Sequence, residues 1–95
     1  MSLMDFVWDP DKRAKNLRKH GIDFEDARVV FEGAILAFED QRQSYGEQRL
    51  VGLGALRNLI VAIAFTEATD DVIRILSIRK ATRHERRLYF QHLAN

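Results

Sequence analysis

"LIVAIAF", residues 59–65, is apolar at every position. Side chains alternate between the two faces of a strand, so a strand of this kind presents apolar groups on both sides. We therefore expect it to be the central strand of a sheet that is covered on both faces. Helices must cover one face, and the other face needs the final helix, a partner chain, or both.

Segments with strand-like composition lie on either side of this run. They are "AILAFED" at 34–40, "QRLVGLGAL" at 48–56 and "DVIRILSIR" at 71–79. Turn-like residues separate the strands, with "QRQSYG" at 41–46, "RN" at 57–58 and "ATDD" at 68–71. Short connections favour antiparallel neighbours, so the four strands predict an antiparallel meander.

The chain before the sheet predicts a short strand and a helix. Residues 6–8, Phe-Val-Trp, form a short apolar run that ends at Asp9-Pro10. Asp9 can accept hydrogen bonds from the first free amides of a helix, and proline suits the first helical position. We expect a helix over 10–20, ended by Gly21 in a left-handed conformation, with basic residues in its last turn.

Two further helices are marked by their caps. Asp23 precedes apolar residues at helical spacing, so it should begin a second helix that ends at Gly33. Thr82 and Glu85 form the pattern of a capping box, which places the start of the last helix at Arg83. The resulting order is β-α-α-β-β-β-β-α, an α+β domain with helices packed on an antiparallel sheet.

The composition limits the class of protein. The chain has 95 residues, of which 46% are hydrophobic, and we interpret residues 1–95 as one small domain. It has no cysteine, and its three histidines are scattered, so neither disulfides nor a zinc site is expected. No apolar run approaches the roughly 20 residues of a membrane span. We expect a cytoplasmic protein that needs no metal and no cofactor and does not contact a membrane.

A local excess of positive charge lies near the C-terminus, although the net charge of the chain is only +1. Within residues 79–90 the cations are Arg79, Lys80, Arg83, Arg86 and Arg87, and His84, Glu85 and Tyr89 lie among them. Cations at the start of a helix oppose its dipole, so local stability does not explain them. Arginine binds phosphate through paired hydrogen bonds, so the cluster suits a nucleic acid as a partner.

Cleavage of RNA without a metal needs a proton acceptor for the 2′-hydroxyl, donors for the pentacoordinate phosphate and a proton donor for the leaving oxygen. The cluster contains all three types, but each has a second interpretation. Glu85 is a general base or only the partner of Thr82 in the capping box. Tyr89 is a catalytic or base-stacking group or a packed ring. His84 lies in a first helical turn, where the dipole disfavours its charged form, and the arginines also fit a solvated face or a site for an acidic protein.

The first helix is a second basic surface. Its cations are Lys12, Arg13, Lys15, Arg18 and Lys19, and only Ala14 and Leu17 form an apolar stripe. A solvated charged face accounts for this pattern. His20 lies where the helix dipole favours a cation, so capping and catalysis are both open for it.

Two blocks of the chain together resemble the BrnT family of bacterial type II toxins. They are "WDPDKRAKNLRKHGIDFEDA" at 8–27 and "RILSIRKATRHERRLYF" at 74–90. The resemblance implies a RelE-like fold and a toxin that cleaves RNA and inhibits translation. It also implies a BrnA-type antitoxin that neutralises the toxin and binds operator DNA, so that the toxin reaches DNA only through the antitoxin. For the basic first helix, the resemblance adds a contact with RNA or with the antitoxin as the alternative to a solvated face.

The resemblance and the charge pattern together define two sets of candidate residues. We expect the catalytic set to be Arg79, Lys80, Arg83, Glu85, Arg86 and Tyr89. We expect the RNA-binding set to be Lys12, Asn16, Lys19, His20, His84 and Arg87. Two other functions would use the same residues. One is a module that binds nucleic acid or an acidic protein without chemistry, and the other is an inactive toxin kept as half of a repressor complex.

Overall fold

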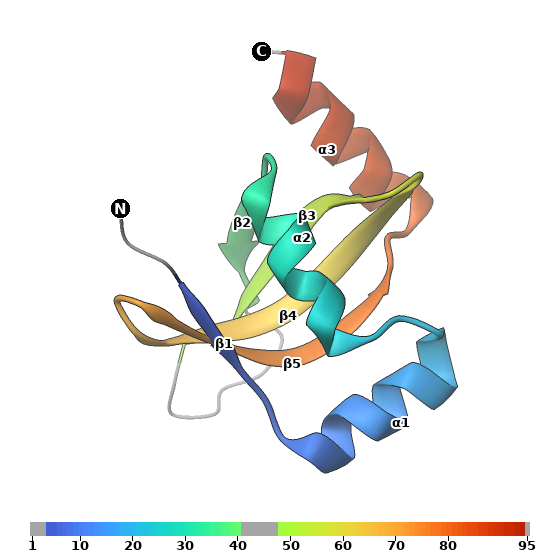
Figure 1. Cartoon of the computed structure of the whole chain (residues 1–95). Coiled ribbons are helices and arrows are strands. Elements are labelled where there is room, and N and C mark those ends of the chain that lie inside the picture. The colour runs from blue at the N-terminus through green and yellow to red at the C-terminus, as the bar shows by residue number, and fades with distance from the viewer. Residues whose placement is uncertain (1–3, 41–47, 95) are drawn as a thin grey trace.

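A five-stranded sheet forms the centre of the structure, a computed structural model in which residues 4–40 and 48–94 are described (Figure 1). The elements are β1 (Asp5–Val7), α1 (Pro10–His20), a 3-10 helix (Phe24–Asp26), α2 (Ala27–Glu32), β2 (Leu36–Glu39), β3 (Leu50–Leu56), β4 (Leu59–Thr69), β5 (Val72–Lys80) and α3 (Arg83–Ala94). The predicted order and the α+β class are therefore confirmed. The turn expected at 41–46 lies outside the described residues.

The strands lie side by side in the order β1-β5-β4-β3-β2. β2 to β5 form the predicted antiparallel meander. β1 departs from an all-antiparallel sheet, because it pairs with β5 in the parallel direction, with Phe6 opposite Ile73. A tight turn forces antiparallel pairing, whereas the chain between β1 and the meander passes through helices and is not held to that direction. The sheet is therefore mixed.

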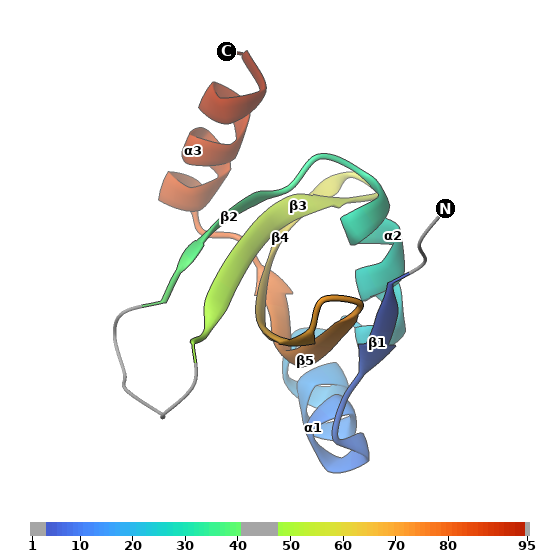
Figure 2. The same ribbon diagram turned by 90° about the vertical axis from the view of Figure 1, so that its left-hand side faces the viewer.

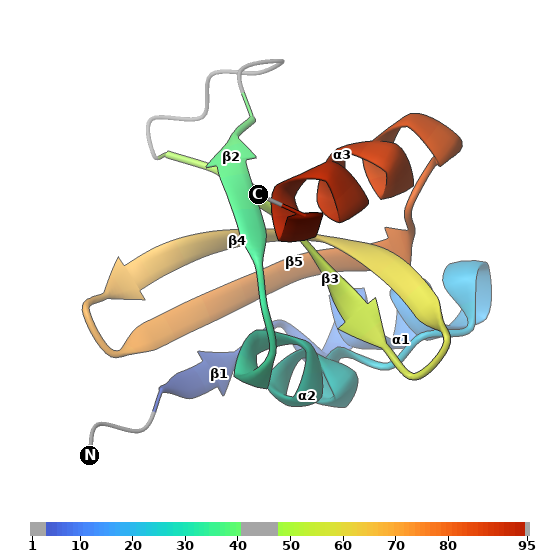
Figure 3. The same ribbon diagram turned by 90° about the horizontal axis from the view of Figure 1, so that it is seen from above.

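β4 is the central strand, as its apolar sequence predicts. On one face the side chains of Val61, Ile63 and Phe65 belong to the main core, beneath α2 and the 3-10 helix. On the other face Ala62 belongs to a smaller core together with Tyr89 of α3. Figure 3 shows α1 and α2 on one side of the sheet and α3 on the other. The final helix thus covers the second face, and contact with a partner chain stays a prediction.

Caps fix α1 at the predicted residues. Oδ1 of Asp9 accepts a hydrogen bond from the amide of Asp11 at 2.8 Å, and Pro10 is the first helical residue. Gly21 has a φ of 70°, and its amide donates to the carbonyl of Leu17 at 2.9 Å. Glycine reaches this left-handed conformation at little cost. α1 therefore begins and ends where the sequence predicts.

α2 lies close against β3. The helix expected after Asp23 begins as a 3-10 turn, in which Asp23 accepts from the amide of Glu25 at 3.0 Å, and it continues as α2 up to Gly33. A Cβ atom on Gly54 of β3 would lie 2.5 Å from Cγ1 of Val30. Only a residue without a side chain lets the helix approach the strand this closely. Gly54 therefore permits the packing of α2 on the sheet.

Candidate functional site

α3 begins with the predicted capping box. The amide of Glu85 donates to Oγ1 of Thr82 at 3.1 Å, and the amide of Thr82 donates to Oε1 of Glu85 at 2.8 Å. The helix therefore starts at Arg83, directly after β5 has ended at Lys80. This joint between β5 and α3 holds the basic C-terminal cluster.

Arg79 and Glu85 form a two-point ion pair across the joint. Nη1 of Arg79 lies 2.7 Å from Oε1 of Glu85, and Nη2 lies 2.9 Å from Oε2. The hydrogen bonds from Arg79 are the main cause of a lowered pKa of Glu85, which falls to about 2. The hydrogen bond from the amide of Thr82 also lowers this pKa, whereas partial burial opposes the shift. So acidic a carboxylate accepts a proton poorly at neutral pH. The geometry favours the capping interpretation of Glu85 over a general base.

Tyr89 is a core residue. It is 3% exposed and belongs to the smaller core with Leu53 and Ala62. Its hydroxyl donates to the carbonyl of Ala34 at 3.1 Å, which ties α3 to the segment before β2. A buried ring offers no face on which a base could stack, and the hydroxyl already has a partner. These contacts favour the packed-ring interpretation of Tyr89 over the expected catalytic or base-stacking role.

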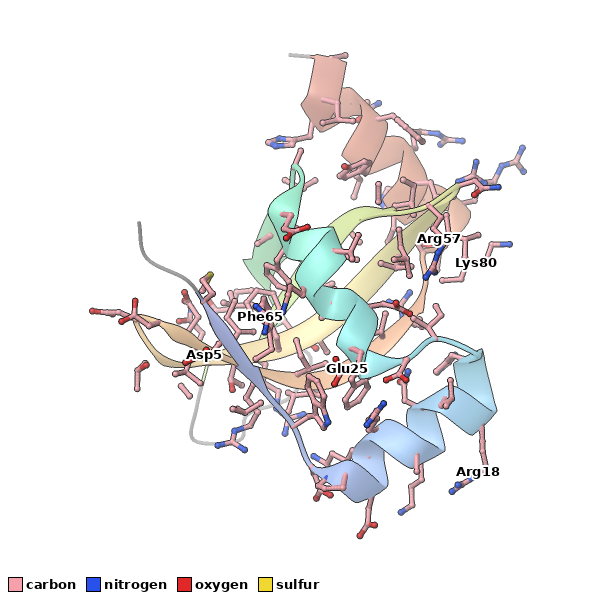
Figure 4. All side chains as sticks on the ribbon, viewed as in Figure 1. Asp5, Arg18, Glu25, Arg57, Phe65 and Lys80 are labelled. Carbon is pink, nitrogen blue, oxygen red and sulfur yellow. The ribbon has the colours of Figure 1, made fainter. Side chains whose placement is uncertain are left out.

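A pocket of about 510 Å³ lies between α3 and the turn that joins β3 to β4. Three cations line it: Arg57, Lys80 and Arg86. The other lining residues are Ala55, Asn58, Leu59, Ile60, Tyr89, Phe90 and Leu93, none of which is acidic. Figure 4 shows Arg57 and Lys80 at the same end of the sheet, near the start of α3. The pocket therefore combines positive charge with an apolar wall.

Arg57 is the lining cation that the sequence analysis did not single out. It lies in the turn between β3 and β4, and its guanidinium lies 3.5 Å from the carboxylate of Asp26. The position of Arg57 could have been predicted from the register of the meander. Val61 pairs with Lys80, so the turn shortly before Val61 must lie beside the end of β5. The predicted antiparallel pairing was sufficient to bring Arg57 to the cluster.

The other residues of the C-terminal cluster lie outside the pocket. Arg83, His84 and Arg87 are exposed on α3 and do not line it. Arg79 is instead engaged at the joint with Glu85. The fold thus divides the cluster among the pocket, the ion-paired joint and an open helix face.

The expected RNA-binding cations of α1 are not brought to the pocket. Lys12, Lys19 and His20 are exposed on α1. Figures 1 and 2 show α1 and α3 well apart, on opposite sides of the sheet. Arg13 of the same helix is bound to Asp23, with Nε 2.7 Å from Oδ1. The two basic helices therefore do not form one site.

Asn16 corrects the expected RNA-binding set. It is 7% exposed, and its side-chain nitrogen donates to the carbonyls of Ile22 at 3.0 Å and of Ile78 at 2.9 Å. The amide of Ile78 in turn donates to Oδ1 of Asn16 at 3.1 Å. A buried amide whose groups are all paired is not available to RNA. Asn16 joins α1 to β5 instead, one residue before Arg79.

Two possible features are absent from the described part of the chain. Within residues 4–40 and 48–94, no three His, Cys, Asp or Glu side chains are grouped so that they could hold a metal ion. Over the same residues, no helix has the length and apolar character that crossing a membrane requires.

Comparison with known proteins agrees with the resemblance seen in the sequence. The family model described as "Ribonuclease toxin, BrnT, of type II toxin-antitoxin system" matches residues 8–85. The crystal structure of the Brucella abortus ribonuclease toxin BrnT is similar, with a TM-score of 0.67 and 29% sequence identity, over 84% of this chain and 99% of that one. No curated protein matched the sequence. The chain therefore belongs to the BrnT family of ribonuclease toxins of type II toxin-antitoxin systems.

Proposed function

We propose that this chain is a toxin that cleaves RNA without a metal ion, in the pocket between α3 and the β3–β4 turn. The observation that carries the proposal is the lining of that pocket by three cations and no carboxylate. RNA phosphates are anionic, and further negative charge develops on their oxygens in the transition state of cleavage. Fixed guanidinium and ammonium groups stabilise that charge, whereas a divalent metal would need anionic oxygen ligands.

Lys80 and Arg86 are the proposed catalytic residues. They line the pocket from two elements, the end of β5 and the first turns of α3. Arg86 offers parallel N–H donors that match the nonbridging oxygens of a phosphate. The 2′-oxygen bonds to phosphorus as the bond to the 5′-oxygen breaks. A water molecule takes the proton of the 2′-hydroxyl, and the Lys80 ammonium donates a proton to the leaving 5′-oxygen. Both residues would act more strongly on the transition state than on bound RNA.

The other candidate residues have supporting roles in this proposal. Arg79 and Glu85 position α3 against β5 through their ion pair, and Tyr89 positions it against the segment before β2 through the hydrogen bond of its hydroxyl to Ala34. Exposed cations outside the pocket would guide RNA toward it, because long-range attraction of phosphates needs no fixed geometry. These basic residues are Arg83, His84 and Arg87 on α3, and more weakly Lys12, Lys19 and His20 on α1.

The proposed setting is the cytoplasm, where cutting RNA inhibits translation. The proposed partner is a BrnA-type antitoxin, since a type II toxin family implies an antitoxin. Operator DNA would be bound by the antitoxin and not by this chain. The exposed apolar side chains at the pocket, Leu59, Phe90 and Leu93, support the partner because a protein contact would remove them from water.

Single-turnover cleavage of RNA at saturating protein tests this function. The wild-type protein is expected to cleave at the same rate with and without excess chelator. Lys80→Ala and Arg86→Ala should each slow cleavage on the order of 10²-fold, because each removes a charge-assisted donor. Arg18→Ala is the matched control, since Arg18 is an exposed cation of α1 (Figure 4) and should leave the rate unchanged.

Two results would contradict the proposal. Cleavage that stops in chelator and returns with a divalent ion would show that a metal takes part. Lys80→Ala and Arg86→Ala proteins that cleave within a few-fold of the wild-type rate would make the pocket a docking surface.

A second function, binding without chemistry, is favoured by one observation. The pKa of Glu85 is lowered to about 2 and the hydroxyl of Tyr89 is engaged by Ala34, so neither is a ready proton acceptor. Such a protein would serve as half of a repressor complex and bind its partner with salt-dependent affinity. Intact RNA after long incubation with the wild-type protein, together with retained antitoxin binding, would identify this function.

A further inference from the structure

The pocket has an apolar wall beside its cations. Leu59 at the start of β4 and Phe90 and Leu93 of α3 contribute to it, and Phe90 is 51% exposed. The Phe90 ring lies nearly edge-on to the ring of Tyr89, with the centroids 5.7 Å apart. Tyr89 is itself fixed by its hydrogen bond to Ala34. Phe90 is therefore an exposed aromatic ring with a rigid neighbour.

Arg57 is held in a backbone conformation that disfavours its side chain. Its φ of 55° lies in the left-handed region, which residues other than glycine enter rarely and at a cost in stability. Its ion pair with Asp26 spans 3.5 Å, and the Arg57 side chain is 71% exposed, so the pair contributes little. Strain of this kind is concentrated where a side chain has a function. The two-residue turn between Leu56 and Leu59 requires a positive φ at its first residue, so what Arg57 itself adds is a guanidinium held beside the pocket.

We propose that this pocket binds one unpaired nucleotide of single-stranded RNA, with the base stacked on Phe90 and an adjoining phosphate held by Arg57. The inference rests on the proposed function, because RNA is taken as the substrate. An aromatic ring next to cations matches the two parts of a nucleotide, a flat base and an anionic phosphate. The volume of about 510 Å³ lies in the range of sites for small molecules and admits a nucleotide.

The same chemistry selects a single strand over a duplex. An aromatic side chain stacks on a base of any sequence, but only on a base that has left its own stack. Bases of an A-form duplex are stacked on their neighbours and paired, so Phe90 cannot reach their faces. Lys80 and Arg86 lie in the same pocket as Phe90, so a stacked base would bring its own phosphates to the proposed catalytic residues. Phe90 thus acts as a substrate-positioning ring.

Fluorescence anisotropy with a labelled 2′-O-methyl RNA tests the proposal, because this probe lacks the attacking hydroxyl and cannot be cleaved. The wild-type protein should bind the single strand about tenfold or more tightly than the matching duplex. Phe90→Ala should weaken single-strand binding about tenfold or more, and Phe90→Trp should restore it to within about threefold. Phe38→Ala is the control, since Phe38 is an exposed aromatic residue of β2 that does not line the pocket.

Removing bases from the probe separates stacking from charge. At one position of the RNA, an abasic site should weaken binding to the wild-type protein about as much as Phe90→Ala does. The two changes together should then add no further loss, because they remove the same contact. Arg57→Ala should weaken binding of the intact and the abasic RNA by the same factor, and this factor should shrink as salt is raised.

Three results would overturn the proposal. The first is equal affinity of wild-type and Phe90→Ala protein for the single strand, and the second is equal affinity of the wild-type protein for single strand and duplex. The third is loss of antitoxin binding in Phe90→Ala with RNA binding intact, which assigns the pocket to a protein partner. The probe is not cleaved, so these results do not depend on catalysis. A protein that binds as described but leaves unmodified RNA intact contradicts the proposed function alone.

Discussion

α1 and α3 are both basic helices, yet the fold uses them in different ways. α1 carries exposed cations on one side of the sheet, and the residue that holds it in place is the uncharged Asn16. α3 places Arg86 in a pocket, and its start is held by the ion pair of Arg79 with Glu85. The difference shows that the density of charge along a sequence does not locate a site. A site needs charged side chains that line a common pocket, and adjacent residues that hold these side chains in place.

The largest effect on stability is expected from removing the residue that anchors α1 to the sheet. Asn16→Ala leaves the amide and carbonyl of Ile78 and the carbonyl of Ile22 without their partner. A buried polar group without a partner costs about 1–3 kcal/mol, so we expect the free energy of unfolding to fall by about 3 kcal/mol. Urea titration measures the change. Lys15→Ala, exposed on the same helix, should shift it by less than about 0.5 kcal/mol.

If the Asn16→Ala protein unfolds at the same urea concentration as the wild type, Asn16 is not the anchor of α1. The contrast between the two helices would then rest on α3 alone.

Lowering the pH should weaken the joint between β5 and α3. The pKa of Glu85 is lowered from 4.5 to about 2 in the folded protein. A lowered folded pKa stabilises the protein above the unfolded pKa, and this stabilisation is lost as the pH falls through 4.5 toward 2. Glu85→Gln keeps a side chain that can cap the helix but lacks the charge. Near neutral pH it should be less stable than the wild type by about 1–2 kcal/mol, after allowance for solvent screening of a partly exposed pair.

The diagnostic feature is the pH dependence of this difference in the free energy of unfolding. It should shrink toward zero as the pH falls from about 5 to about 2, because the wild-type carboxylate becomes protonated there. Other carboxylates are common to both proteins, so subtraction removes them. A difference that stays constant over this range would show that the ion pair with Arg79 does not stabilise the joint.

Arg57→Gly should raise the stability of the protein and lower its affinity for RNA. Glycine relieves the left-handed backbone at this turn, so the free energy of unfolding should rise by up to about 1 kcal/mol. Binding of single-stranded RNA should weaken at the same time, because the guanidinium is gone. Arg57→Ala is the matched control, since it removes the guanidinium and keeps the strain. An Arg57→Gly protein that is less stable than Arg57→Ala would refute the strain argument.

The smallest effects are expected from the cations of α1. Lys12→Ala and Lys19→Ala should each change RNA affinity by less than about threefold, with the difference vanishing as salt is raised. Their free energies of unfolding should stay within about 0.5 kcal/mol of the wild type. A loss of cleavage as large as that of Arg86→Ala would place α1 in the site and remove the contrast between the helices.

Features set by neighbouring residues could be predicted from the sequence. Asp9 and Gly21 mark the ends of α1, and the pattern of Thr82 and Glu85 marks the start of α3. The central place of β4 also follows from its own residues, because only a strand covered on both faces is apolar on both. Lys80 and Arg86, which line the pocket, could be singled out from the sequence because they lie on either side of this capping box.

Features set by distant residues could not be predicted in the same way. Asn16 and Ile78 are 62 positions apart, and a buried asparagine looks in the sequence like an exposed one. The partner of the Tyr89 hydroxyl, Ala34, is equally remote. The parallel direction of β1 depends on how the helices return the chain to the sheet. Each of these depends on tertiary contacts that leave no periodic pattern in the sequence.

The carboxamide of Asn16 also closes the outer edge of β5. A peptide unit offers a neighbouring strand one donor and one acceptor, and the asparagine side chain offers the same pair. β1 ends at Val7, opposite Arg74, and beyond that point Asn16 engages both the N–H and the carbonyl of Ile78. Unpaired backbone groups along an edge strand act as a template for aggregation between molecules. A single side chain thus imitates the strand that is missing there and occupies the backbone groups of Ile78 that a second copy of the sheet could otherwise pair with.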